Sequence, residues 1–369
     1  MNKYLELTMT HRVDIHGKKM MGWLAPLMLA LTLMVSSCSP ATEGQEGNDA
    51  WVTLTISTGG GAADGGEGMA SRASGSAADK DWQVNDLTIY IFDQTGQVIG
   101  SSYASYSINS QQDITATVKT RKAQGCTVIA LANAGTLSGT YATAQTTSPF
   151  AGVSTLSEFQ QKYITFKDMA SLESAPCLLM VGYLTGFDTT SSGSNISLQR
   201  LASRLDFTIT VNQDKGTGFP IVVDSYQLCH APRSAFYAPA DMSAITLPQG
   251  AAYVDYTPQN TIANPYTAYV YANPATTAQD ATYLLIKAHT QASPTDTRKI
   301  WQSDFKVYLN GITGQADYKL LPNYHYSVNI TVTGSLKSYH GMIASYKAYP
   351  YMAGGSIASW TKEDRPTDM

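Results

Sequence analysis

Charged side chains are scarce in this chain: Asp, Glu, Lys and Arg make up 14% of its 369 residues, and the formal net charge is −4. This balance indicates no basic face that would attract nucleic acid. The acidic residues are scattered singly, so they supply no carboxylate pair for glycoside hydrolysis. P-loop, HExxH and GxSxG patterns are missing, and we interpret Asp93 and Asn133 as turn formers. We therefore expect no catalytic residue, no cofactor and no enzyme activity.

Cysteine is also rare, with four residues in the whole chain. Cys126, Cys177 and Cys229 each lie in an apolar, strand-like stretch without CxxC spacing, which predicts buried thiols rather than disulfides. A bridge between one pair of them is the alternative in an oxidising compartment. The histidines beyond residue 37 have no metal-ligand spacing, so no metal site is expected.

The pronounced apolar run, Trp23–Val35, is too short to span a bilayer as a helix. It follows Lys18 and Lys19, and two serines separate it from Cys38. A basic start, a short apolar core and small residues before a cysteine are typical of a bacterial lipoprotein signal. A signal peptide without lipidation and a short membrane anchor are the alternatives.

The lipoprotein interpretation predicts how the chain is processed and attached. Residues 1–37 would be removed as the signal peptide, and Cys38 would carry the acyl chains, such as palmitate. Residues 38–50, which are polar, would form a tether to the outer membrane.

Tyrosine is abundant, with 23 residues, and threonine and serine are frequent. Such residues favour strands, and many short alternating segments separated by Gly, Pro and Asn turns predict an all-β protein with two tandem β-sandwiches. We place the domain boundary in the turn-rich segment 212–220, which gives an N-terminal sandwich at 51–215 and a C-terminal one at 216–334. Residues 335–369 then form a C-terminal extension, too apolar for a discarded tail and too short for a domain.

The first strand has the clearest alternation in the chain. Its apolar residues Val52, Leu54 and Ile56 alternate with polar ones, which predicts a half-buried strand. The segment 59–78 follows, rich in Gly, Ala and Ser, with Met69 as its one large apolar residue. Such a segment buries too little surface to order itself.

One arginine stands out in that segment. Arg72 is its only basic residue, so a trypsin-like protease would find a cleavable bond between Arg72 and Ala73. The alternative is a loop arginine without a role.

A short helix is predicted in the first domain. Ser154 or Thr155 would cap it, and Leu156, Phe159 and Tyr163 would lie on one face.

Several motifs, taken in order, resemble the Bacteroidia-type fimbrillins, the lipoprotein precursors of type V pilus subunits. The resemblance covers the chain from Cys38 onward. Where many members of the family carry Arg-Asn near the last motif, this chain has Pro322-Asn323. The motifs are the lipobox ending in Cys38, Val84–Gly96, Val128–Ala134, Leu179–Gly182, Arg200–Arg204 and Leu321–Ile330.

The resemblance implies a mechanism. Two transthyretin-like sandwiches would be followed by a donor-strand extension, and residues 51–72 would be a propeptide strand and loop. Cleavage after Arg72 by an Arg-specific protease would release the strand, and a C-terminal segment of another subunit would take its place. The candidate donor residues are Tyr349, Tyr351, Ile357 and Trp360.

The same resemblance implies a place and partners. The partners would be other fimbrial subunits, the outer membrane through the lipid on Cys38 before cleavage, and a host or bacterial surface ligand in adhesion. The location would be a surface fimbrium on the outer membrane.

Two other functions stay open at this stage. An anchor subunit would keep Cys38, and a tip subunit would lack a working donor strand. A surface glycan-binding lipoprotein would show a planar strip of exposed Tyr and Trp on one sheet face.

Overall fold

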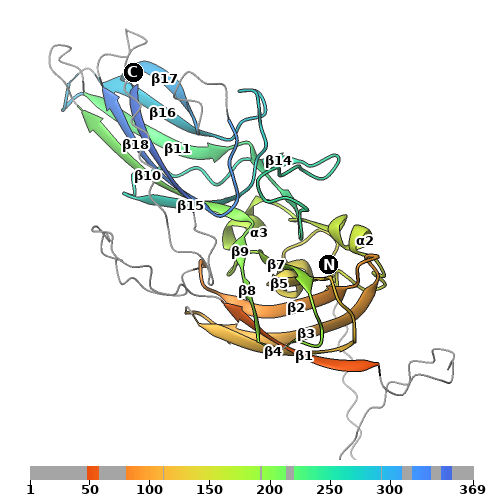
Figure 1. Cartoon of the computed structure of the whole chain (residues 1–369). Helices are drawn as coiled ribbons and strands as arrows, with labels where there is room; N and C mark the ends of the chain where they lie inside the picture. The colour runs from red at the N-terminus through yellow and green to blue at the C-terminus, as the bar shows by residue number, and fades with distance from the viewer. Residues whose placement is uncertain are drawn as a thin grey trace, which may run out of the picture. The chain divides into compact units, whose positions relative to one another are not determined.

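The computed structural model describes residues 48–57, 80–110, 112–191, 193–212, 220–291, 293–309, 318–333 and 342–350. Strands dominate this part of the chain, and its helices are short (Figure 1). The predicted all-β sandwich architecture is confirmed. No helix in the described ranges is long and apolar enough to cross a membrane.

The first sandwich consists of two sheets. One has the order β4-β1-β8, and the other has the order β3-β2-β5-β7-β9. Their facing side chains form one apolar core, to which every one of these strands except β9 contributes. The strands are β1 (Asp49–Ser57), β2 (Val84–Phe92), β3 (Val98–Ile108), β4 (Asp113–Arg121), β5 (Cys126–Ala132), β7 (Met180–Phe187), β8 (Ser194–Ser197) and β9 (Gln199–Arg200).

A helical layer covers the other face of the five-stranded sheet. It comprises α1 (Ala134–Thr140), α2 (Leu156–Gln160) and α3 (Met169–Ser174), with the short strand β6 (Tyr163–Thr165) between α2 and α3. Aromatic side chains fill the space between layers; for example, the rings of Phe150 and Phe159 stack 4.5 Å apart.

The predicted helix is confirmed as α2, but it is shorter than expected. The Thr155 side chain accepts a hydrogen bond from the backbone of Glu158, and the Glu158 carboxylate accepts one from the backbone N–H of Thr155, which is a capping box. Tyr163 does not belong to its face, because the chain leaves the helix after Gln160 and pairs in β6 with β13 (Ser234–Phe236).

Asn133 ties the strands to the helical layer. Its side-chain amide donates to the carbonyls of Gln83 and Leu178, both at 2.7 Å, and its oxygen accepts from the backbone of Asn85 at 2.8 Å. Its φ of 69° is left-handed, a conformation that asparagine tolerates better than most residues. Asn133 is completely buried, which confirms a structural turn residue.

The second sandwich again has two sheets, of order β15-β10-β18-β19 and β11-β16-β17. Its core continues the apolar cluster of the helical layer. Two short antiparallel ladders, β6-β13 and β12-β14, lie outside these larger sheets. The remaining strands are β10 (Ala202–Asn212), β11 (Ile221–Cys229), β12 (Ala231–Pro232), β14 (Tyr253–Val254), β15 (Tyr266–Tyr271), β16 (Tyr283–Gln291), β17 (Lys299–Tyr308), β18 (Tyr324–Thr333) and β19 (Met342–Pro350).

The predicted boundary of the first sandwich at residue 215 is wrong for its last strand. Strand β10 pairs with β15 and β18, which belong to the second sandwich, so strand pairing changes domain directly after Arg200. Leu205, Phe207 and Ile209 alternate as expected, but alternation shows which side chains are buried and not in which sheet they lie.

The predicted buried thiols are confirmed. Cys126, Cys177 and Cys229 are free and buried. Burial raises the pKa of Cys177 to about 12 and that of Cys229 to about 11, so both thiols stay protonated at neutral pH.

Replacing Asn133 should destabilise the protein strongly. Asn133→Ala leaves three backbone groups without their hydrogen-bond partner and keeps a side chain at positive φ. The free energy of unfolding, measured by urea denaturation, should therefore fall by about 3 kcal/mol. Asn133→Gly should be milder by about 1 kcal/mol, because glycine tolerates that φ. The exposed Asn260→Ala is the control and should change stability by less than about 0.5 kcal/mol.

Candidate functional site

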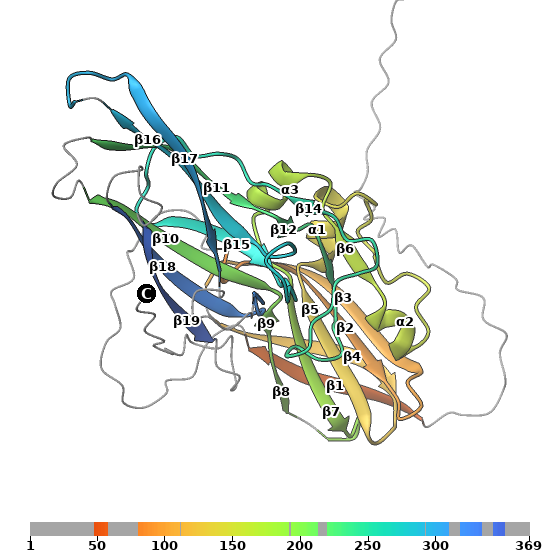
Figure 2. The same cartoon turned by 90° about the horizontal axis from the view of Figure 1, so that it is seen from above.

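Strand β1 occupies the middle of its sheet. It pairs antiparallel with β4 along its whole length, from Asp49 opposite Arg121 to Ser57 opposite Asp113. On its other side it pairs parallel with β8, with Leu54 aligned to Ser194. Figure 2 shows β1 beside β4 in this sheet. Both backbone edges of its second half are therefore hydrogen-bonded to neighbours.

The inward face of β1 is completely desolvated. Val52 is 1% exposed, and Leu54 and Ile56 are 0% exposed. Each lies opposite another apolar residue of β4: Val52 opposite Val118, and Leu54 opposite Ala116. These side chains belong to the core that the first sandwich shares between its two sheets. The predicted half-buried strand therefore exists, with its apolar half in the core.

The outward face of β1 is polar except for Trp51, whose side chain is largely exposed. Trp51 lies opposite Lys119, and the Lys119 ammonium pairs with Asp49 at 2.8 Å. Both of these charged side chains are mostly in water, so the pair adds little stability. The inward face thus holds β1 in place.

Strand β1 is also isolated along the chain. Among the described residues, only Asn48 and β1 precede Lys80, where the rest of the first sandwich begins. Cys38, Arg72 and Ala73 lie outside the described residues. Any cut between Ser57 and Lys80 leaves β1 held by noncovalent contacts alone.

The proposed donor segment falls partly in strand β19. This strand pairs antiparallel with β18 at the edge of its sheet, and Tyr349 lies opposite His325. Its backbone is thus hydrogen-bonded to a neighbouring strand of the sheet on one side, unlike that of β1. Tyr351, Ile357 and Trp360 lie outside the described residues.

A second group of functional candidates lies where the two sandwiches meet in sequence. Arg200 is 1% exposed, and its guanidinium donates from Nε to the carbonyl of Asp81 at 2.9 Å and also from Nη2 to that carbonyl. The guanidinium lies 4.8 Å from the ring centre of Trp82. The backbone of Arg200 donates to the side-chain oxygen of Asn323 at 3.1 Å. We call Asp81, Trp82, Arg200 and Asn323 the Arg200 junction.

Ion pairs extend from this junction along β10 and β18. Arg204 pairs with Asp81 at 3.1 Å and with Asp206 at 3.2 Å, and Asp206 in turn contacts Nε2 of His325 at 2.7 Å. Burial by itself raises the pKa of Asp206, but the hydrogen bonds from His325 and Thr267 and the charge of Arg204 outweigh it and bring the pKa to about 2.

In the sequence, Arg200 and Asn323 belong to two separate motifs, and Asp81 belongs to none of the motifs. The residues are more than a hundred positions apart, and no spacing rule connects them. Their one sequence signal is an arginine between the apolar residues Leu198 and Leu201, because a buried arginine normally requires a fixed partner.

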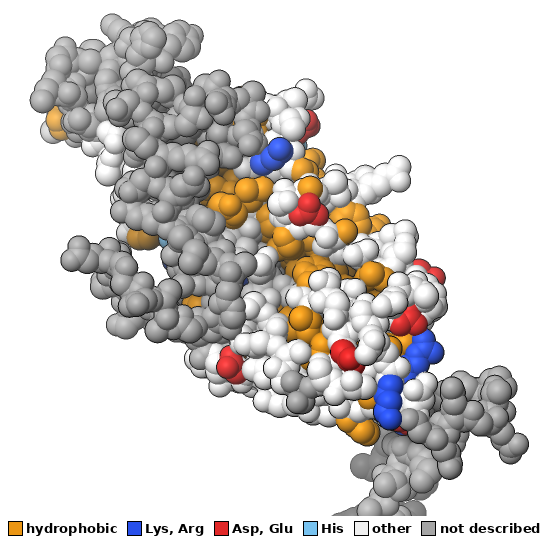
Figure 3. All heavy atoms as spheres, in the orientation of Figure 1, with side chains coloured by type: hydrophobic (Ala, Val, Ile, Leu, Met, Phe, Trp, Pro, Cys, Tyr) orange, Lys and Arg blue, Asp and Glu red, His pale blue; other side chains and the backbone are white. Residues whose placement is uncertain are grey.

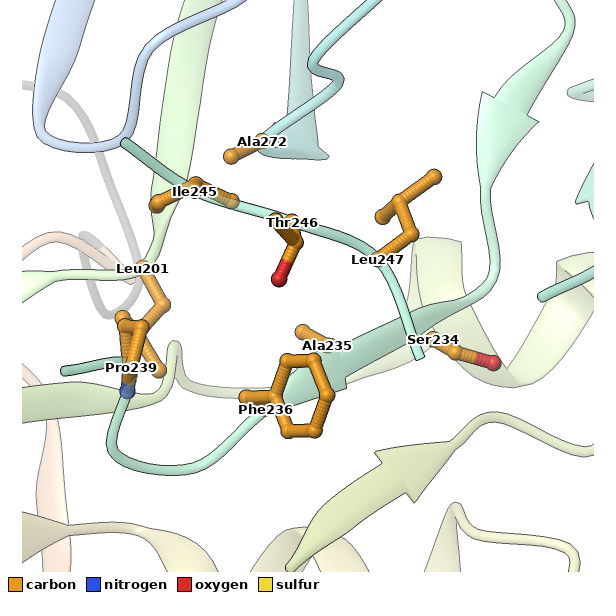
Figure 4. A pocket seen from close by; sticks show the side chains of 9 residues that line it. All are labelled: Leu201, Ser234, Ala235, Phe236, Pro239, Ile245, Thr246, Leu247 and Ala272. Carbon is orange, nitrogen blue, oxygen red and sulfur yellow. The ribbon is translucent and has the colours of Figure 1, made fainter. Parts of the chain in front are cut away.

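One pocket in the described part of the chain is small. The pocket in Figure 4 encloses about 10 Å³, room for roughly one water molecule. It lies between Leu201, β13 and the segment 239–247.

An open groove of about 460 Å³ lies beside Lys80 and Tyr269. Its polar groups are already engaged, since Lys80 donates to the carbonyl of Glu173 at 2.6 Å and Thr257 donates twice to the Glu173 carboxylate. No group of His, Cys, Asp and Glu within the described ranges could hold a metal ion.

The described surface does not show the aromatic strip that glycan binding would favour. Its large exposed apolar side chains are Trp51, Tyr103 and Tyr163, which lie in β1, β3 and β6 and thus in three different sheets. Tyr256 is buried and donates its hydroxyl to the carbonyl of Tyr269. Figure 3 shows charged side chains thinly distributed over the described part of one face, with several gathered toward its lower right.

Known proteins resemble the chain in two ways. Residues 51–200 match the family described as Major fimbrial subunit protein (FimA). No curated protein sequence matches the chain. The matched segment ends at Arg200, where strand pairing passes from the first sandwich to the second.

Solved structures share the fold over most of the chain. A candidate cell adhesion protein from Parabacteroides distasonis is 17% identical with a TM-score of 0.58, over 83% of this chain and 99% of its own. A fimbrilin (FimA) from Porphyromonas gingivalis is 12% identical with a TM-score of 0.53, over 80% and 97%. The tip fimbrial protein Mfa3 from the same organism, with a C-terminal truncation, is 15% identical with a TM-score of 0.51, over 81% and 99%.

Truncating the inward face of β1 should destabilise the first sandwich. Leu54→Ala removes a completely buried side chain from a packed core, so the free energy of unfolding should fall by about 3 kcal/mol. Thr53→Ala, on the outward face of the same strand, is the matched control and should cost less than about 1 kcal/mol. Urea denaturation of the uncut chain measures both, and equal losses would contradict the assigned facing of β1.

Asp206 should make stability depend on acid. Its folded pKa of about 2 lies below the ordinary value of roughly 3.9, so folding favours the carboxylate. Its contribution is complete above about pH 4 and is lost as the pH falls toward 2. Asp206→Asn should lower stability by about 2 kcal/mol at pH 7 and by little at pH 2.

The control for this pH dependence is Asp304→Asn, an exposed carboxylate in β17 of the same domain. Denaturation curves collected from pH 7 to pH 2 give both profiles. A parallel decline of Asp206→Asn and the unmodified protein between pH 4 and 2 would show that Asp206 does not carry the effect.

Proposed function

We propose that this chain is a fimbrillin-type fimbrial subunit that is exported as a lipoprotein, cleaved after Arg72 and polymerised by strand donation. As a fimbrial subunit it works at the cell surface with other fimbrial subunits as partners, and its family is one of structural proteins. Attachment to the outer membrane through acyl chains on Cys38, and binding of a surface ligand, belong to the proposal.

The observation that carries the proposal is the position of β1. It is the middle strand of its sheet, its apolar side chains are fully buried, and it precedes the proposed cut in the chain. One cleavage would therefore turn an internal strand into a separate peptide. Few other cuts in a β-sandwich would free a complete central strand.

The loss of β1 would leave a defined vacancy. Strands β4 and β8 would each present unpaired backbone groups, and the core would lose the side chains of Val52, Leu54 and Ile56. Burial of such a side chain contributes about 1.5–3 kcal/mol. A vacancy of this kind favours the addition of another strand, and a strand of another subunit would fill it.

The C-terminal extension is our candidate donor. Its residues 335–369 follow β18, and the part in β19 lies at a sheet edge, from which a strand can leave without opening the sheet's interior. Tyr349, Tyr351, Ile357 and Trp360 remain the proposed inserting residues. In this proposal the lipid on Cys38 is an export handle that is lost with the propeptide.

The cut is testable on the full-length precursor. Treatment with an Arg-specific protease should yield a mature N-terminus at Ala73, and Arg72→Ala should abolish it. Arg298→Ala is the control, because that arginine lies in a loop with a side chain that is 84% exposed, and its replacement should leave cleavage after Arg72 unchanged. N-terminal sequencing identifies the cut, and SDS-resistant ladders on unheated gels report polymerisation.

The outcomes separate the possible roles. Ladders that form after the cut and disappear on deletion of residues 335–369 would support the stalk subunit. Mature surface protein that still begins at Cys38 would instead indicate an anchor. Ladders that persist without residues 335–369 would refute strand donation by the C-terminal extension.

A further inference from the structure

The Arg200 junction connects the core around β1 with the strand that carries β19. On one side, Trp82 is partly buried and packs against the apolar core to which Val52, Leu54 and Ile56 belong. The guanidinium of Arg200 lies over the Trp82 ring at 4.8 Å. The placement of the Arg200 side chain therefore depends on a side chain that rests on the β1 core.

On the other side, Arg200 fixes the start of β18. Asn323 directly precedes this strand, is 5% exposed and has a φ of 62°. Its side-chain oxygen accepts from the backbone of Arg200, and its backbone donates to the carbonyl of Ala202 at 3.0 Å. Two hydrogen bonds from the segment around Arg200 thus hold a left-handed turn at the entry to β18.

Strand β18 in turn is the sheet partner that holds β19. The pairing begins with Tyr324 opposite Pro350 and continues through His325 opposite Tyr349. The Asp206 carboxylate contacts His325 at 2.7 Å and also pairs with Arg204, which reaches Asp81. The end of β18 that pairs with Tyr349 is therefore tied to the junction by its backbone and by an ion-pair chain.

A connection through a buried arginine depends strongly on the groups that contact the guanidinium. Its charge is tolerated in the interior only while its hydrogen-bond acceptors and stacking partner are in place. Arg200 uses a backbone carbonyl, an aromatic ring and its own backbone in three directions, and lysine cannot reproduce the planar, bidentate geometry. Weaker contacts on the Trp82 side should therefore also weaken the contacts on the Asn323 side.

We call the place between β4 and β8 that β1 fills the β1 slot. We propose that Arg200 is a positioning residue that couples occupancy of the β1 slot to docking of β19 on β18. With β1 in place, the junction is ordered and β19 stays paired. With β1 gone, Trp82 loses its support, the turn at Asn323 loosens, and β19 leaves its sheet more easily. The purpose of this coupling rests on the proposed function, since it would release the donor segment only from subunits that have lost β1.

The test is amide hydrogen exchange of residues 342–350 in the uncut chain. Leu54→Ala weakens the β1 slot and should speed exchange in β19 by about fivefold, the low end of typical coupling between sites. Leu137→Ala is the matched control, because Leu137 is equally buried but packs in α1 on the opposite face of the five-stranded sheet. Leu137→Ala should leave hydrogen exchange in β19 unchanged, as long as exchange occurs by local opening and not through global unfolding.

Junction variants complete the experiment. In the background of Asn323→Gly, which keeps the left-handed φ but removes the contact to Arg200, β19 should exchange fast already, and Leu54→Ala should add no more. Arg200→Lys should behave in the same way where it folds. Equal effects of Leu54→Ala and Leu137→Ala, or a full response to Leu54→Ala without Asn323, would overturn the proposal.

The exchange experiment is independent of processing. It uses an uncut chain, so a negative result would leave cleavage at Arg72 untouched. Conversely, a chain that is never cut at Arg72 would still reveal the coupling between β1 and β19.

Discussion

The burial of β1 between β4 and β8 is the constraint on which the rest of the structure depends. A strand in the middle of a sheet supplies both hydrogen bonds and core volume, so the first sandwich cannot be complete without one in that place. The chain nevertheless provides this strand from a segment separated from Lys80 by more than twenty residues. One element therefore stabilises the sandwich and lies where a single cut would detach it, and the proposed function depends on that combination.

Much of the fold could be predicted from local pattern. The alternation of Val52, Leu54 and Ile56 correctly predicts their burial, and the Thr155 cap correctly predicts α2. Sheet membership could not be predicted, because β10 alternates equally well in either domain and its partners are decided by long-range pairing. The Arg200 junction escaped prediction for the same reason, since its members meet only in the folded chain.

Motifs that looked like family signatures have identifiable structural tasks. Asn133 precedes α1 and joins the starts of β2 and β7 through its side chain, which explains an asparagine after an apolar strand. At Gly182, an added Cβ would lie 2.6 Å from both the Ile196 side chain and the Ser197 carbonyl, so β7 can pass β8 only as glycine. Both residues therefore have structural roles in the first sandwich.

The opposite senses of the two neighbours of β1 have a further consequence. Because β4 runs antiparallel and β8 parallel to it, the slot has a direction, and a replacement strand that keeps both of these pairings must enter with the same sense. An acceptor in the first sandwich and a donor at the far end of the chain form a heterologous contact, which does not close into a symmetric pair. Assembly through this slot would give a polar filament whose two ends differ chemically, one offering an empty slot and the other an unused strand.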